Sequence, residues 1–159
     1  MAGPDSLRLQ RDSQGEAAVF VKVSEAANLA IHALTYLAND RGTAPVSTAT
    51  VAGVLGASEA HLTKVFQRLK RVGLVDSTRG PKGGVSLARE PGQVRILDIY
   101  ETIDGPLGND TCLLGKSGCM FKQCVFGGML TAINDLARSY MSSTTLADLV
   151  TEPSAFEQS

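Results

Sequence analysis

The chain has 159 residues, a mass of 16.7 kDa, 43% hydrophobic and 19% charged residues, and a net charge of −1 at pH 7. This composition is typical of a folded globular protein, and it excludes a disordered chain and a membrane-spanning one. The nearly balanced charge argues against uniform attraction to nucleic acid or lipid, although an average can hide opposed patches.

The first twenty residues differ from the rest of the chain. Residues 1–20 are polar and show no lasting helical or strand periodicity, so we interpret them as a flexible leader or an addition to the native chain. They hold no apolar block followed by a small-residue cleavage pattern, which excludes a standard secretory signal. We therefore expect a cytoplasmic protein that does not associate with membranes, in a compartment where disulfides are rare.

The periodic part of the chain begins near residue 21 with two predicted helices. Apolar residues recur at spacings of three and four after Ser24, which predicts an amphipathic helix that Ser24 caps and that ends near Ala38. A turn follows at residues 39–45. Ser47 then caps a short helix that Gly56 terminates.

A third helix, from Ser58 to Gly73, has one apolar and one basic face. The basic face carries His61, Lys64, Arg68 and Arg71. A short helix, the turn at residues 56–58 and a basic amphipathic helix together match the helix-turn-helix, whose second helix reads DNA.

A basic hairpin is predicted directly after this helix. Leu74–Ser77 and Val85–Ala88 have strand character around a glycine-rich tip that carries Arg79 and Lys82. Residues 60–89 contain seven Lys and Arg against one acid, Asp76. The order of helix, turn, basic helix and basic hairpin predicts a winged helix-turn-helix. A solvated helix face, or a hairpin that merely flanks a small helical core, is the structural alternative.

The second half of the chain is acidic at first and then apolar. Residues 98–110 hold four acids and no base, so we expect them to face a different partner from the basic segment. Residues 96–103 form a predicted short helix that Gly105-Pro106 stops. Residues 125–140 carry an apolar stripe at helical spacing that so small a domain cannot cover, which favours a homodimer. Residues 144–150 read as a final short helix.

The predicted fold is therefore mainly α with a small β-hairpin, a winged helix-turn-helix followed by a long dimerisation helix. We divide the chain into a leader (1–20), a DNA-binding domain (21–105), a cysteine loop (106–124), the dimerisation and terminal helices (125–150) and a flexible tail (151–159).

All three cysteines lie in or at the end of the glycine-containing cysteine loop: Cys112, Cys119 and Cys124. Free cysteine prefers burial, yet this is the least core-like stretch of the chain. Thiolates gathered on a loop suit zinc or an iron-sulfur cluster, and the missing Cys-x-x-Cys pair favours iron and sulfur. A thiol redox switch and inert cysteines remain as alternatives.

Several segments together resemble the winged-helix transcriptional regulators of the IscR and NsrR type, which sense iron-sulfur status, redox state or nitric oxide. The resemblance runs from about residue 21 to residue 150. The residues that carry it are 21–38, the HL-x-KV-x-x-x-L pattern at 61–69, the Arg79-Gly80 and Gly83-Gly84 pairs, the three-cysteine loop and TTLADLV at 144–150.

This resemblance implies a homodimer whose long helices pair and which holds a 2Fe-2S or 4Fe-4S cluster on the three cysteines. Their spacing differs by one residue from commoner members, and Gly127 stands where some members have a histidine. Other members take a fourth ligand from the partner's first helix, at positions that match Asn28 and His32. An imidazole is the better iron ligand, so we expect His32 to complete the site, with Glu25 as a weaker candidate and a core histidine as the structural alternative.

On DNA, the predicted contacts divide into two kinds. Phosphate contacts, which carry affinity without sequence information, are assigned to Arg68, Lys70, Arg71 and Lys82. Base contacts in the major groove are assigned to Ser58, His61, Thr63, Lys64 and Gln67. Arg79 is expected to enter a narrow A·T-rich minor groove. A symmetric dimer implies double-stranded DNA with a palindromic operator.

Two other functions are weighed against this regulator. A small metal or thiol redox enzyme lacks support, because the sequence has no Cys-x-x-Cys pair, no phosphate-binding glycine loop and only two histidines. We therefore predict that the protein is not an enzyme. A cluster-free DNA-binding regulator controlled by a protein partner remains open.

Overall fold

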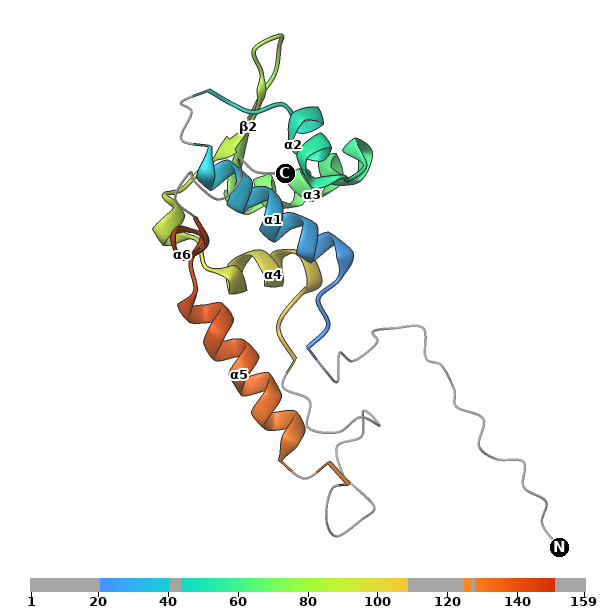
Figure 1. Cartoon of the computed structure of the whole chain (residues 1–159), viewed down its shortest axis with the longest axis vertical. Coiled ribbons are helices and arrows are strands. Elements are labelled where there is room, and N and C mark those ends of the chain that lie inside the picture. Colours follow the sequence, from blue (N-terminus) through green and yellow to red (C-terminus); the bar gives the residue numbers. More distant parts are fainter. Residues whose placement is uncertain (1–20, 41–43, 109–124, 127, 151–159) are drawn as a thin grey trace, which may run out of the picture.

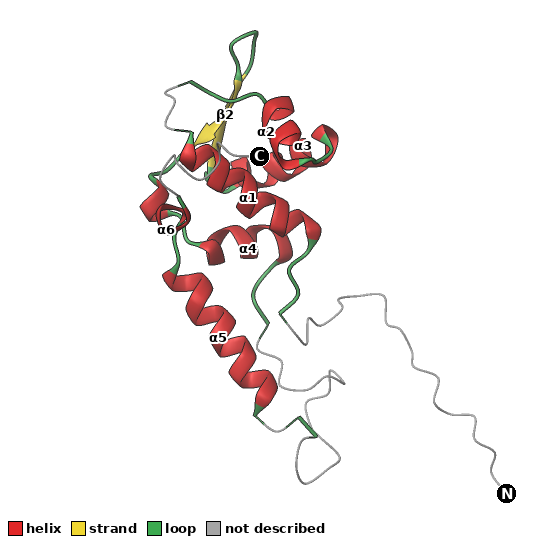
Figure 2. Cartoon of the chain, viewed as in Figure 1, coloured by secondary structure: helices red, strands yellow, loops and turns green. Residues whose placement is uncertain are grey.

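The computed structural model describes residues 21–40, 44–108, 125–126 and 128–150, and these confirm the mainly α fold with one β-hairpin (Figures 1 and 2). The leader, nearly all of the cysteine loop and the tail lie outside the described residues. The elements are α1 (Glu25–Asn39), α2 (Thr48–Leu55), α3 (Glu59–Arg71), β1 (Val75–Thr78), β2 (Gly84–Leu87), the 3-10 helix η1 (Pro91–Gln93), α4 (Ile96–Asp104), α5 (Met129–Ser143) and α6 (Leu146–Leu149).

The first three helices begin where the sequence predicts, because each has a serine at its N-cap. The hydroxyl oxygen of Ser24 accepts a hydrogen bond from the Ala27 amide at 3.1 Å, and Ser47 and Ser58 cap α2 and α3 in the same way. Gly56 ends α2 with φ +62°, a left-handed conformation that glycine adopts without strain. These local signals fix the tight turn between α2 and α3.

The core is formed by one face of each of α1, α3 and α4. The side chains of Leu34, Leu62 and Ile99 are fully buried there. Leu146 of α6 is also fully buried in this cluster. The amide of Leu146 donates to the carbonyl oxygen of Val94 at 2.9 Å, and this hydrogen bond joins the start of α6 to the segment before α4.

The two strands form an antiparallel hairpin in which Val75 pairs with Leu87 and Thr78 with Gly84. Each strand lies within one residue of its predicted position. Val46 extends the hairpin, since its amide and carbonyl bond Val85 at 2.9 and 2.8 Å. A Cβ at Gly84 would overlap the Val46 carbonyl, so only glycine permits this approach.

The second half of the described chain differs from the sequence prediction in detail. The long helix begins at Met129, whereas Val125 and Phe126 lie in a turn before it. The last predicted helix is a single turn, and the 3-10 helix η1 was not predicted. None of the helices in the described ranges combines the length and apolar composition needed to cross a bilayer.

Candidate nucleic-acid interface

The face of α3 that the sequence predicts to contact DNA is mostly open to solvent. Thr63, Lys64 and Gln67 are exposed on this helix. His61 is half-buried at its start, and its Nδ1 lies 4.0 Å from a carboxylate oxygen of Glu25. Ser58 is exposed, but its hydroxyl accepts the His61 amide at 3.4 Å. Thr63, Lys64 and Gln67 thus face solvent, whereas Ser58, although exposed, also has a capping role.

The hairpin tip adds a second exposed basic element. Arg79 and Lys82 lie in the tip between β1 and β2, and both are exposed. Figure 1 shows the tip projecting away from the helices, at the same end of the molecule as α2 and α3, whereas α5 extends toward the other end. The arrangement is that of a wing beside a recognition helix.

Two other basic side chains of α3 have partners within the chain. The Nη2 of Arg68 donates to the carbonyl oxygens of Thr102 and Ile103, in the last turn of α4. The Nζ of Lys70 donates to the hydroxyl of Ser77 on β1. These contacts brace α3 against its neighbours, and charge counting alone did not reveal them.

The acids of α4 also bond within the chain. Asp104 accepts from the amide and the hydroxyl of Ser24, which joins the end of α4 to the start of α1. Asp98 accepts from Arg95 at 2.8 and 3.1 Å, and this hydrogen-bonded pair lowers the pKa of the Asp98 carboxyl and raises that of Arg95. Burial raises the pKa of Tyr100.

Residues at the start of the cysteine loop connect α4 to α5. The Glu101 carboxylate accepts the Leu107 amide at 3.1 Å and lies 3.9 Å from Nη1 of Arg138 on α5. Nη2 of Arg138 donates to the Leu107 carbonyl. Leu107 is buried, so this backbone segment is held from two sides.

The proposed cluster ligands are only partly placed by the structure. Cys112, Cys119 and Cys124 lie outside the described residues. His32 and Asn28 are exposed on one face of α1, and Nδ1 of His32 is 2.8 Å from the Asn28 carbonyl oxygen. His32 is therefore a surface side chain and not a core histidine. No group of three or more metal-binding side chains occurs among the residues that the structure describes.

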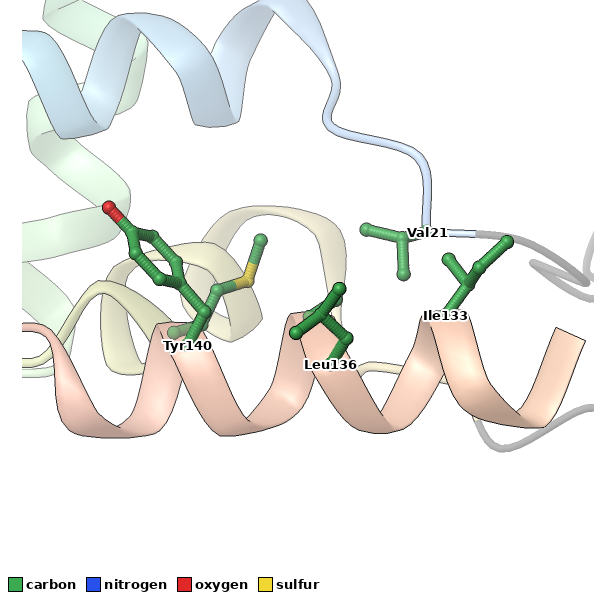
Figure 3. Close-up of a pocket in the computed structure, with 6 residues that line it drawn as sticks. Val21, Ile133, Leu136 and Tyr140 are labelled. Atoms are coloured by element: carbon green, nitrogen blue, oxygen red, sulfur yellow. The ribbon is translucent and has the colours of Figure 1, made fainter. Parts of the chain in front are cut away.

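One face of α5 is apolar and open. Leu130 and Asn134 are buried on its inner side, whereas Leu136 is 71% and Tyr140 59% exposed. Figure 3 shows Leu136, Tyr140 and Ile133 on α5 beside Val21, along an open apolar groove. The stripe recognised in the sequence thus divides into a face packed against the core and a face without cover from the described residues.

The recognition helix and the basic wing define a winged-helix DNA-binding protein. Residues 23–152 match the Rrf2 family, described as an iron-dependent transcriptional regulator, and the chain belongs to this family. This confirms the resemblance stated from the sequence, and it makes the protein a DNA-binding transcriptional regulator and not an enzyme.

Named relatives agree with this assignment. The HTH-type transcriptional regulator IscR of Enterobacter sp. (strain 638) is 28% identical over 131 residues, which cover 82% of this chain and 80% of the relative. The structure of T. potens IscR is 28% identical with a TM-score of 0.66, covering 89% of this chain and 96% of that one. CymR, the global cysteine regulator of B. subtilis, is 26% identical with a TM-score of 0.69, covering 84% of this chain and 100% of that one.

Proposed function

We propose that the protein is a cytoplasmic homodimeric regulator that binds a palindromic double-stranded operator and senses iron-sulfur status, redox state or nitric oxide through an iron-sulfur cluster. One observation carries the DNA-binding part: α3, which has exposed polar side chains, and the exposed basic wing tip lie at the same end of the molecule (Figure 1). The cluster part is supported by family membership and by the sulfur-rich loop.

The proposed DNA contacts follow from exposure and chemistry. Thr63, Lys64 and Gln67, with His61 and Ser58 at the helix start, face base edges in the major groove. Lys82 neutralises a phosphate, and Arg79 enters the minor groove where A·T-rich sequence narrows it. Lys70 and Arg71, also exposed on α3, are further phosphate contacts.

The donor set of the cysteine loop fits a soft metal centre. Cys112, Cys119 and Cys124 would hold a 2Fe-2S or 4Fe-4S cluster, and the exposed imidazole of the partner subunit's His32 would complete it, with Glu25 as the second candidate. When bound, such a cluster would supply reactivity toward oxidants and nitric oxide. The chain's own residues would hold the cluster through the three thiolates and one further ligand.

The homodimer is supported by the exposed face of α5. Its large apolar side chains, Leu136 and Tyr140, would be covered by the same helix of a second copy, which a symmetric interface requires. A dimer presents two recognition helices, so its operator has two related half-sites.

The DNA-binding part is tested by selecting operators from random duplex DNA and measuring their affinity by fluorescence anisotropy. Arg79→Ala should weaken binding and reduce preference for bases in the A·T-rich part of the operator. Lys22→Ala removes an equal charge outside α3 and the hairpin and should leave that preference intact. Equal loss on all sequences for Arg79→Ala would contradict a minor-groove role.

The cluster part is tested by anaerobic purification with iron and sulfide analysis and a visible spectrum. The wild type should be coloured and contain iron and acid-labile sulfide, Cys119→Ala should lose both, and His32→Ala should alter the spectrum. Colourless, iron-free wild-type protein that still binds its operator would support the cluster-free regulator instead.

A further inference from the structure

The contact between Arg68 and α4 gives this side chain a role other than binding phosphate. Nη2 of Arg68 donates to the carbonyl oxygens of Thr102, at 3.4 Å, and of Ile103. The last four carbonyl groups of a helix have no partner within the helix, and a cation there also interacts favourably with the helix dipole. The guanidinium therefore binds the C-terminal end of α4, 34 and 35 residues away in the sequence.

The same turn of α4 also contacts α5 and the start of the cysteine loop. The carboxylate of Glu101, the residue before Thr102, accepts the Leu107 amide and faces Arg138 of α5. Arg138 also donates to the Leu107 carbonyl. The last turn of α4 thus contacts both α3, through Arg68, and α5 with the start of the cysteine loop, through Glu101.

We propose that Arg68 is a positioning residue, which couples the angle of the recognition helix to α5 and Leu107 through the last turn of α4. The inference rests on the proposed function in one respect only, that α3 is the helix that binds DNA. A displacement of Leu107 or of α5 shifts Glu101, and the carbonyl groups that Arg68 holds shift with it. Because coupling between two sites is reciprocal, a change at Arg68 also alters the Leu107 segment.

The first measurement separates positioning from phosphate binding and needs neither a cluster nor a known operator. Binding to a random-sequence duplex is measured over a range of salt concentrations. Log affinity falls as log salt rises, and each lost phosphate contact lowers the magnitude of this negative slope by about 0.9. Lys82→Gln should show this decrease. Arg68→Gln should keep the wild-type slope and lower affinity by the same factor at every salt concentration.

The second measurement detects the coupling itself by amide hydrogen exchange in the protein without DNA. Arg68→Gln should speed exchange of the Gly105 and Leu107 amides, which bond to Glu101, by about tenfold or more, as expected from loss of a charged hydrogen bond. Lys70→Gln is the matched control, because it removes an equal charge from α3 but its partner is Ser77. It should leave both amides unchanged.

Either of two results overturns the proposal. One is a salt dependence for Arg68→Gln that weakens as much as for Lys82→Gln. The other is amide exchange at Gly105 and Leu107 that is the same in Arg68→Gln as in the wild type. If Arg68→Gln does not fold, Arg68→Lys is measured instead. Lysine keeps the charge but lacks the guanidinium that donates to both carbonyl oxygens, so exchange of the Gly105 and Leu107 amides should still be faster than in the wild type. If the wild type does not bind duplex DNA at all, the proposed function fails, whereas the exchange measurement still tests the coupling.

Discussion

The exposed face of α5 allows a quantitative test of the proposed dimer. Complete burial of a leucine side chain contributes about 1.5 to 3 kcal/mol, and Leu136 leaves 71% of its surface exposed in the single chain. Covering that fraction contributes about 1 to 2 kcal/mol per subunit, or about 2 to 4 kcal/mol for the two copies in a symmetric interface. Leu136→Ala should therefore raise the dimer dissociation constant between about 30-fold and 1000-fold.

Sedimentation velocity over a concentration series measures this constant directly. Val54→Ala is the matched control, because Val54 is an exposed apolar residue, 58% accessible, on α2 and away from α5. Its dissociation constant should equal that of the wild type. A wild-type chain that stays monomeric at every concentration, or equal constants for the two variants, would refute the assignment of this face to the dimer.

Two further predictions concern stability. Gly84→Ala should lower the free energy of unfolding in urea by more than about 1 kcal/mol, because the added Cβ displaces Val46 and breaks its hydrogen bonds. Gly53→Ala is the control: Gly53 lies within α2 with open space around its Cα, so alanine should raise the free energy of unfolding by about 0.5 to 1 kcal/mol. Asp98→Asn should destabilise the protein near neutral pH, since Arg95 lowers the folded-state pKa of this carboxyl and its contribution is present above the unfolded pKa of about 3.9. That contribution is lost as the pH falls through the lowered folded-state pKa. The melting temperatures of wild type and variant should therefore converge in acid. A difference in melting temperature that is the same at all pH values would contradict this role of Asp98.

The DNA-binding half could be predicted because its signals are local. Ser24, Ser47 and Ser58 cap helices only three residues from the amides they bind, and Gly56 ends α2 by its own conformation. The spacing of apolar residues then fixed which face of α3 is buried. Such features need no knowledge of distant parts of the chain.

The parts that sequence reasoning missed depend on residues far apart in the chain. Ser24 donates hydrogen bonds to Asp104, 80 residues away, and the sequence around either residue does not indicate this pairing. The hydrogen bonds from Arg68 to the carbonyl oxygens of Thr102 and Ile103 could not be predicted either, because any sequence supplies backbone carbonyl groups. The phosphate contact expected for Arg68 from the sequence stays a prediction. The ligand roles of the cysteines and of His32 stay predictions.

The burial of Leu146 has a consequence for how the protein is made. Translation delivers α1 and α3 long before this leucine, so the core of the nascent chain has a gap at the position of Leu146 until α6 is made. Proteolytic cleavage just upstream of it would reopen that gap, at a cost comparable to a large-to-small core substitution, about 2 to 5 kcal/mol. The single turn of α6 therefore helps to stabilise the packing of α1 and α3, although it lies far from both in the sequence.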